Sequence, residues 1–471
     1  MSTPKAKSIG SSLVEILIAL AVFSLIISAS VLVFFGGQNF AVSSLEAREA
    51  TQKAHDGVEA LRFIRDTKWS TMTDGIHGLE FLASGQWQLT SSPDISDGFT
   101  RTVSISTDIN TIKHIGLTVT WEHLPEGTRT ISLKQTLAPP NQAIAGDWTQ
   151  PCVVGKSDGT PGAKGADVYY SNGKAYVASS AVAVGKEDLF IFNVSNPKSP
   201  SLLGSLNVEE GWKSVTVAGD YAYGIEENSP DFFVVDVSNF AAPIKKAKLV
   251  LSGGSGRYVM VRGNYVYATT ANNESGPEFF VIDVTNPLIP SVVATKEFGV
   301  DINEVSVLRS AAYLATSSDT KELIVVDVTT PNNPTEIGSY NAPGTTDARA
   351  VHAKSKTRVY LGRDVSAEKE LLILDATAPS SIALRGSTDI TSSVYSLITA
   401  GTLSFLGTDD TNEEFQNYYI RDPANIQKNG NLNFSNIGTG ADYYNNIVYM
   451  SVRNVDILQL VTSTINGICG G

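Results

Sequence analysis

An aromatic residue that follows a short turn recurs along the last two thirds of the chain at nearly constant intervals. The seven positions are Tyr176, Tyr223, Tyr267, Tyr313, Tyr360, Phe405 and Tyr449. Their spacings are 47, 44, 46, 47, 45 and 44 residues. A period this regular predicts seven copies of one structural unit, each of which packs against its neighbours.

A second marker, a short run of β-branched, aliphatic and aromatic residues, follows each aromatic position. Clear runs occupy residues 190–194, 233–237, 280–284, 324–328 and 372–376, with a weaker sixth at 419–422 and a degenerate seventh at 457–460. Such runs favour strands and exclude a helical solenoid of similar period. Several short strands in a repeat of about 45 residues are typical of β-propeller blades, so we expect seven blades, with six or eight as alternatives.

The repeats resemble the LVIVD family, whose defining run appears here as Leu323-Ile324-Val325-Val326-Asp327. The marker Asp recurs in most repeats just before a turn, where its carboxylate can accept hydrogen bonds from backbone N–H groups. A residue that repeats around a ring is expected to have a structural role. The face built from the blade-connecting loops is the expected ligand surface.

The N-terminus contains a 23-residue apolar stretch, residues 13–35, whose one formal charge is Glu15. A helix of that length spans roughly 34 Å, which is enough to cross a bilayer core. Lys5 and Lys7 precede it without any acidic residue, so we expect a cytoplasmic N-terminus and an extracytoplasmic remainder. A secretory signal peptide fits poorly, because the run is too long and no Ala-x-Ala-like site follows it.

The residues from Lys5 to Leu20 resemble the leader of type IV prepilins, a short basic peptide that ends in Gly and precedes an apolar helix with Glu at its fifth position. The resemblance implies that prepilin peptidase cleaves between Gly10 and Ser11 and that the amino group of Ser11 is methylated. It also implies that Glu15 neutralises an N-terminal amine during filament assembly. A plain signal anchor is the alternative.

The pattern after the apolar stretch predicts that the helix continues to about Asp66 and packs on a small sheet. Small and apolar residues recur at Ala47, Ala50, Ala54, Val58, Leu61 and Ile64. Alternating stretches within residues 67–137 predict antiparallel strands, and they resemble the sheet of PilV-like minor pilins. The expected fold class is an α+β pilin module, with a long N-terminal helix over residues 11–66 and this sheet, followed by an all-β seven-bladed propeller over residues 166–471.

Residues 138–165 interrupt the strand pattern with prolines and glycines, and they predict a linker. The two cysteines of the chain, Cys152 and Cys469, lie near the two ends of the predicted propeller. A closed propeller brings its ends together, and the topology predicted above places both thiols outside the cytoplasm, so we expect a disulfide between them. Two unrelated free thiols are the alternative.

The chain shows no arrangement of residues that is typical of catalysis, so we expect no enzyme activity. It lacks a Gly-x-Ser-x-Gly turn, and its five His have no metal-binding spacing. Asp409, Asp410 and Glu413 form the densest acidic loop, which would bind Ca²⁺ weakly or serve as a solvated hairpin tip; no other cofactor is expected. The net charge of −13 argues against binding to nucleic acid.

The resemblance to type IV prepilins, taken with the predicted propeller, implies a minor type IV pilin, located at the tip of a filament or decorating it, that displays the propeller for adhesion or ligand binding. Its expected partners are prepilin peptidase, other pilins that contact the N-terminal helix, and an unidentified surface ligand. It would reside in the bacterial inner membrane as a precursor and then on the pilus at the cell surface. A type II secretion pseudopilin and a membrane-anchored propeller enzyme are the alternatives.

Overall fold

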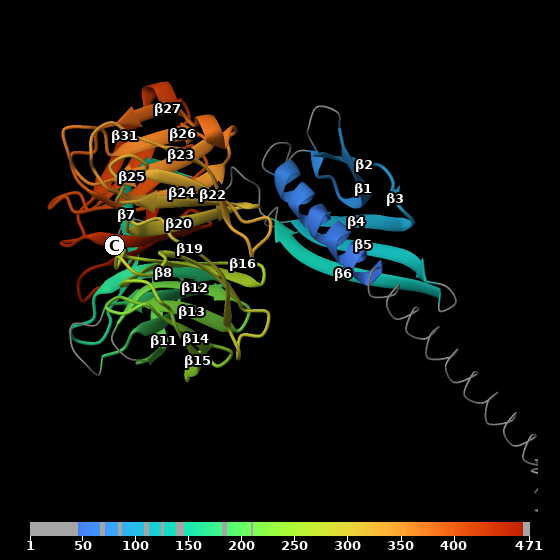
Figure 1. Cartoon of the computed structure of the whole chain (residues 1–471), viewed down its shortest axis with the longest axis horizontal. Helices are drawn as coiled ribbons and strands as arrows, with labels where there is room; N and C mark the ends of the chain where they lie inside the picture. Colours follow the sequence, from blue (N-terminus) through green and yellow to red (C-terminus); the bar gives the residue numbers. More distant parts are fainter. Residues whose placement is uncertain are drawn as a thin grey trace, which may run out of the picture. The chain divides into compact units, whose positions relative to one another are not determined.

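The computed structural model describes residues 46–65, 71–82, 87–107, 113–123, 127–137, 146–180, 186–208 and 211–464 (Figure 1). The chain divides into two compact units, residues 1–140 and residues 141–471. Within the described ranges, no helix is both long enough and apolar enough to cross a lipid bilayer. The predicted membrane span over residues 13–35 lies outside them.

The first unit packs one helix, residues 46–65, on an antiparallel sheet in the order β2-β1-β4-β5-β6, with β3 paired to β4. The strands are β1 (Gly75–Phe81), β2 (Trp87–Thr90), β3 (Asp94–Ser96), β4 (Phe99–Thr107), β5 (Lys113–His123) and β6 (Gly127–Leu137). The predicted small-residue stripe faces this sheet, since Ala50, Ala54 and Leu61 are buried with Val103 and Leu117. Small side chains allow this close approach of helix and sheet.

The fold class predicted from the sequence, an α+β pilin module with a long N-terminal helix before the propeller, is wrong for this structure. Strands β1–β34 supply nearly all of its secondary structure, and the helix over residues 46–65 is the one α-helix in the described ranges. Repeats rich in β-branched residues fill most of the chain, and these residues favour strands. Residues 11–45 of the predicted helix lie outside the described residues.

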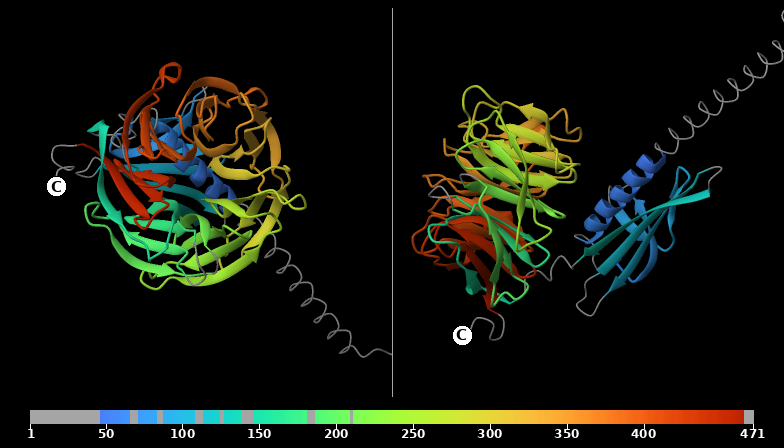
Figure 2. Two further views of the ribbon diagram at one scale, coloured as in Figure 1. Left: turned by 90° about the vertical axis from the view of Figure 1, so that its left-hand side faces the viewer. Right: turned by 90° about the horizontal axis from the view of Figure 1, so that it is seen from below.

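The second unit consists of seven four-stranded antiparallel sheets, which are the blades of a β-propeller (Figure 2, left). Blades 1 to 6 are β8–β11, β12–β15, β16–β19, β20–β23, β24–β27 and β28–β31, and blade 7 is β32–β34 with β7. The first strand of each blade contacts the first strands of both neighbouring blades, which places these strands innermost. The prediction of seven blades is confirmed.

The strands occupy equivalent places in each blade. The inner strands are β8 (Gly165–Ser171), β12 (Trp212–Ala218), β16 (Gly256–Arg262), β20 (Ile302–Leu308), β24 (Ala348–Ser355), β28 (Val394–Ala400) and β32 (Gly438–Tyr444). The second strands are β9 (Lys174–Ser179), β13 (Tyr221–Glu226), β17 (Tyr265–Thr270), β21 (Ala311–Thr316), β25 (Arg358–Arg363), β29 (Leu403–Thr408) and β33 (Ile447–Val452). The third strands are β10 (Leu189–Asn193), β14 (Asp231–Asp236), β18 (Phe279–Asp283), β22 (Leu323–Asp327), β26 (Leu371–Asp375), β30 (Phe415–Tyr419) and β34 (Leu458–Thr464).

The outer strands complete the blades. They are β11 (Ser201–Leu206), β15 (Ile244–Val250), β19 (Ser291–Lys296), β23 (Thr335–Tyr340), β27 (Ala383–Thr388), β31 (Gln427–Leu432) and β7 (Asp147–Ser157). Two short 3₁₀ helices, η2 (Pro379–Ser381) and η3 (Pro423–Asn425), follow the third strands of blades 5 and 6. The outer strands are the most exposed of each sheet, as is expected of an edge.

Blade 7 closes the ring by joining the two ends of the propeller. Strand β7 comes before all other propeller strands in the chain, yet it pairs antiparallel with β34, with Cys152 opposite Thr462. This strand lies within residues 138–165, so the propeller begins earlier than the predicted linker allows. Pro151 and Gly155 are residues that disfavour strands, so the sequence pattern did not predict a strand here. Both are tolerated because β7 is an edge strand.

The two sequence markers form the cores between blades. Each of the seven periodic aromatic residues lies in a second strand and is at most 4% exposed. The third strands are buried on both faces, which explains why their apolar residues run on without alternation. Most core clusters join adjacent blades, as do Val215 and Trp212 of blade 2 with Tyr176 and Ile191 of blade 1.

The marker Asp has the predicted structural role. In Asp236, Asp283, Asp327 and Asp375 the carboxylate accepts a hydrogen bond from the backbone N–H two residues later, and Asn193 does the same with its amide oxygen. In blade 6 the predicted alignment is wrong. Tyr419 occupies the marker position there, and Asp422 instead caps η3 by accepting from the Ala424 N–H.

A further acidic residue, just before the third strand, fixes the loop that leads to the next blade. Buried carboxylates at this place in five blades accept a hydrogen bond of 2.6–2.8 Å from the backbone N–H twenty residues later. The residues are Asp188, Glu278, Glu322, Glu370 and Glu414. These hydrogen bonds hold the blade-connecting loops, and each loop positions the first residues of an inner strand.

The inner strands are sheet edges, and side chains of the preceding blade satisfy some of their backbone N–H groups. Asp167 accepts from the Val215 N–H, Ser214 from the Val259 N–H, and Glu304 from the Val351 N–H. Two residues further along the inner strands, Thr216, Ser306 and Asp442 accept hydrogen bonds from backbone N–H groups of the inner strand of the following blade. An unpaired buried N–H is costly, so these side chains stabilise the ring.

Candidate functional site

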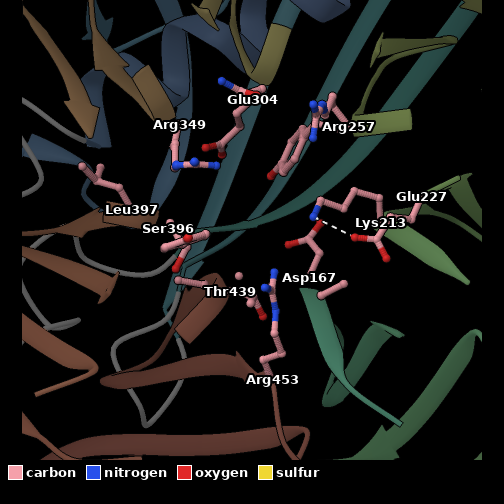
Figure 3. A pocket seen from close by; sticks show the side chains of 16 residues that line it. Asp167, Lys213, Glu227, Arg257, Glu304, Arg349, Ser396, Leu397, Thr439 and Arg453 are labelled. Atoms are coloured by element: carbon pink, nitrogen blue, oxygen red, sulfur yellow. Dashed lines mark hydrogen bonds and ion pairs between the residues drawn. The ribbon is translucent and has the colours of Figure 1, made fainter. Parts of the chain in front are cut away.

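A cavity of about 310 Å³ lies on the propeller axis, at the end where the inner strands begin (Figure 3). The second residues of all seven inner strands line this axial cavity. They are Ala166, Lys213, Arg257, Asn303, Arg349, Tyr395 and Thr439. The chain repeats its structural residues from blade to blade, but no two neighbouring blades share a residue at this position. The fold therefore does not dictate these side chains.

The rim of the axial cavity is rich in cations, three of which have an acidic partner. Lys213 Nζ lies 3.2 Å from Glu227 Oε1 (Figure 3), and Arg257 Nη2 lies 2.6 Å from Asp301 Oδ2. Arg349 forms an ion pair with Asp364. The fourth cation, Arg453, follows β33 and also lines the cavity. These ion pairs hold the side chains in place while leaving nitrogen atoms that can bind a ligand.

Tyr395 lies between blades 5 and 7 and contacts two of the arginines. The guanidinium carbon of Arg349 is 5.0 Å from the centre of the Tyr395 ring, and that of Arg453 is 5.9 Å from it. Both distances are within the range of cation–π attraction. The ring thus restricts the orientation of two planar guanidinium groups beside the axial cavity.

Burial and like charges act together on Lys213. Burial is the main cause that lowers the pKa of this ammonium, the nearby Glu227 opposes that effect, and repulsion from Arg453 and Arg257 lowers the pKa further. Arg453 and Arg257 are therefore close enough to Lys213 to repel its charged form.

Two acidic groups, Asp167 and Glu304, line the cavity together with these cations. Burial raises the pKa of Asp167 to about 7, although its carboxylate accepts hydrogen bonds from the Ser214 hydroxyl and the Val215 N–H. Burial also raises the pKa of Glu304 well above its ordinary value, while hydrogen bonds from the Val351 N–H and Tyr258 oppose the rise. These two carboxyl groups bridge adjacent blades, so their positions have a structural explanation without catalysis.

Three of the residues singled out in the sequence, Gly10, Ser11 and Glu15, lie outside the described residues. Cys152 lies in β7 and is disulfide-bonded. Cys469 also lies outside the described residues, so its pairing with Cys152 stays a prediction.

The acidic loop of blade 6 uses its carboxylates locally. Asp409 accepts from the Ser393 N–H, Asp410 accepts from the Asn412 and Glu413 N–H groups, and Glu413 forms an ion pair with Lys428. Over the part of the chain that the structure describes, no group of three His, Cys, Asp or Glu side chains is placed to hold a metal ion.

Sequence reasoning missed the residues of the axial cavity. It treated the repeats as equivalent and gave weight to what they share, whereas Lys213, Arg257, Arg349 and Arg453 are what they do not share. Alignment of the inner strands would have exposed Lys213, Arg257 and Arg349, because the other four repeats have a polar, small or aromatic residue at this position: Ala166, Asn303, Tyr395 and Thr439.

Comparison with known families finds LVIVD repeats at residues 166–208, 212–249, 253–295 and 303–342, which correspond to blades 1 to 4. The search of curated proteins gave no significant match.

Solved structures with a similar fold are distant in sequence. A protein from Lactobacillus plantarum is 12% identical with a TM-score of 0.53, and the match covers 63% of this chain and 93% of that one. The β-propeller domain of Myceliophteria thermophila Cps50 (Swd1) is 10% identical with a TM-score of 0.51, covering 67% and 100%. A putative 6-phosphogluconolactonase from Bacteroides fragilis is 9% identical with a TM-score of 0.52, covering 63% and 90%. At such identities the similarity shows the propeller fold alone.

Proposed function

We propose that this protein is a non-catalytic binding protein whose propeller presents the axial cavity to a ligand outside the cytoplasm. The observation that carries the proposal is the contrast between the blades. Residues that build the fold repeat around the ring, whereas the seven inner-strand residues that line the cavity at one shared position differ between neighbouring blades. Side chains that the fold does not require, brought together in one cavity, are typical of a ligand site.

An enzymatic role has less support from the cavity. The best candidates for acid–base chemistry, Asp167 and Glu304, accept hydrogen bonds from the backbone of the following blade. Ser396 is the serine that lines the cavity. Its hydroxyl donates a hydrogen bond to Met450 Sδ, and among the described residues it has no hydrogen bond to a basic side chain. A nucleophile needs an adjacent base for activation. The similarity to a lactonase extends to the fold and supports no reaction here.

We further propose that the N-terminal segment carries the propeller to the cell surface as a minor pilin does. The support is the prepilin-like sequence, in which Gly10 and Ser11 form the cleavage site and Glu15 is the charge used in filament assembly. Prepilin peptidase and other pilins would then be its partners. Assembly into a type II secretion pseudopilus is the alternative.

Loss of an aromatic side chain from the cavity tests the binding function. The full chain, purified in detergent, is immobilised and screened against bacterial and host surface polysaccharides. We expect a ligand whose binding Tyr395→Ala abolishes and Tyr419→Ala preserves, since Tyr419 is 38% exposed at the end of β30, outside the cavity. Equal binding by both variants, or no ligand for the wild-type protein, would contradict the proposal.

Processing of the N-terminus tests the surface location separately. Gly10→Val should block cleavage, so the protein should keep its precursor mobility on an immunoblot and be lost from sheared surface fibres. If size and location match those of the wild-type protein, the pilin interpretation is wrong. Wild-type protein found in the membrane fraction and absent from fibres would favour a pseudopilus.

A further inference from the structure

The cations of the axial cavity are not fully balanced by acidic side chains. Three of them have an acidic partner, but among the described residues Arg453 forms no ion pair and contacts the ring of Tyr395 instead. Of the two other acidic groups that line the cavity, Glu304 has a pKa raised well above its ordinary value by burial, and burial raises the pKa of Asp167 to about 7. At the rim of the cavity, four cationic side chains therefore face three acidic partners, within a chain whose net charge is −13.

Such an arrangement costs free energy when the cavity holds no anion. Repulsion from Arg453 and Arg257 disfavours the charged form of Lys213, although burial has the larger effect on its pKa. The fold does not require the charges of Lys213, Arg257 and Arg349, because the equivalent residues in other blades are Ala166, Asn303, Tyr395 and Thr439. An anion bound between the cations would reduce their mutual repulsion and would attract each of them.

The geometry favours an oxyanion of a small or terminal group. Tyr395 orients the guanidinium groups of Arg349 and Arg453, and a fixed planar fork binds two oxygens of a carboxylate, sulfate or phosphate. A volume of about 310 Å³ is at the lower end for small-molecule sites, so it suits one sugar-sized unit. The strongly negative net charge of the chain disfavours a long polyanion.

We propose that the axial cavity binds an oxyanion carried by a single sugar-sized group, with Arg453 as the principal cation and Lys213 and Arg349 beside it. This inference rests on the proposed binding function and specifies the chemical class of the ligand. A carboxylate and a phosphate both belong to this class, because both present the same pair of oxygens to a guanidinium group.

Calorimetric titration of the full chain in detergent tests the inference, with glucuronate, glucose 6-phosphate and glucose as probes. We expect at least one of the two anionic sugars to bind, and glucose to bind at least roughly 10-fold more weakly, the difference that a charge-assisted hydrogen bond produces. Comparison of the two anionic sugars identifies carboxylate or phosphate as the preferred group.

Two substitutions assign the binding to Arg453. Arg453→Gln should weaken binding of the preferred sugar by roughly 10-fold or more, and Arg453→Lys should restore part of it by returning the charge without the fork. Arg421→Gln is the matched control, since that arginine is exposed and lies outside the cavity. Thermal unfolding of each variant verifies that it is folded.

The outcomes separate the two proposals. If neither anionic sugar binds, or if Arg453→Gln binds as tightly as the wild-type protein, the oxyanion inference is overturned. A neutral polysaccharide whose binding depends on Tyr395 would then leave the binding function intact. The absence of any Tyr395-dependent ligand would overturn both.

Discussion

The Asp167 carboxylate in blade 1 accepts a hydrogen bond of 2.7 Å from the Ser214 hydroxyl in blade 2. The same carboxylate oxygen accepts from the Val215 N–H, so one acidic side chain joins two inner strands and also lines the axial cavity. Burial nevertheless raises its pKa to about 7, from 3.8 when exposed. The charged form is thus disfavoured despite three hydrogen bonds that stabilise it.

The stability of the propeller should therefore depend on pH through Asp167. Because its pKa is higher in the folded state, the folded protein binds the proton more tightly, and stability falls as pH rises from about 4 to about 7. Asp167→Asn removes this titration. The free energy of unfolding of the variant minus that of the wild-type protein should therefore increase by roughly 2–4 kcal/mol as the pH rises from 4 to 8. Denaturant unfolding at several pH values measures the difference, and a constant difference would contradict the assigned pKa.

Removal of a loop clamp, by which we mean one of the buried carboxylates that accept a hydrogen bond from a blade-connecting loop, should destabilise the propeller. Glu322 is fully buried and accepts a hydrogen bond of 2.7 Å from the Ala342 N–H in the loop that leads to blade 5. Glu322→Ala leaves that N–H without an acceptor, at a cost of about 1–3 kcal/mol in denaturant unfolding. Glu322→Gln keeps an acceptor oxygen and should cost less.

The control for the clamp is Glu368→Ala, because Glu368 is an exposed loop residue of blade 5. Its effect on the free energy of unfolding should be within about 0.5 kcal/mol. Equal losses for Glu322→Ala and Glu368→Ala would show that the Glu322 clamp contributes nothing specific.

A glycine in the outer strand of blade 4 should not tolerate a methyl group. A Cβ at Gly338 would lie 1.7 Å from the carbonyl oxygen of Pro379, which belongs to the turn of blade 5. Gly338→Ala should therefore push the two blades apart and cost about 1–3 kcal/mol in unfolding free energy. Blade 2 has Ala247 at the equivalent place in its register, so Ala247→Gly is the matched control and should cost much less. Similar losses for both variants would contradict a steric cause.

Much of the propeller could be predicted because the structural roles of its repeated residues follow from the sequence immediately around them. The burial of Tyr313 follows from its spacing, and the turn hydrogen bond of Asp327 follows from its position before a turn. The alignment failed in blade 6, where Tyr419 replaces the marker Asp and Asp422 imitates it three residues later. A local pattern cannot tell a missing marker from a shifted one.

Features that depend on distant partners were not predictable in this way. Strand β7 has little strand character of its own and becomes a strand because β34 offers it an unpaired edge. The sequence around Gly338 does not show why glycine is needed there, because the reason is the turn of blade 5 that packs against it. The axial cavity likewise exists only after the ring closes and brings Lys213 and Arg453 together, residues that are far apart in the chain.

The disulfide at Cys152 should stabilise the closed ring. Cys152 lies in β7, the strand through which blade 7 joins the two ends of the propeller, and its expected partner is Cys469. The loop closed would span 317 residues, for which chain entropy gives about 5–6 kcal/mol as an upper figure. Cys469→Ser should abolish the mobility difference between reducing and non-reducing gels and lower the unfolding free energy by about 2–5 kcal/mol. Reductant should weaken the wild-type protein to the same extent and leave Cys469→Ser unchanged. A variant as stable as the oxidised wild-type protein would show that pairing with β34 alone closes the ring.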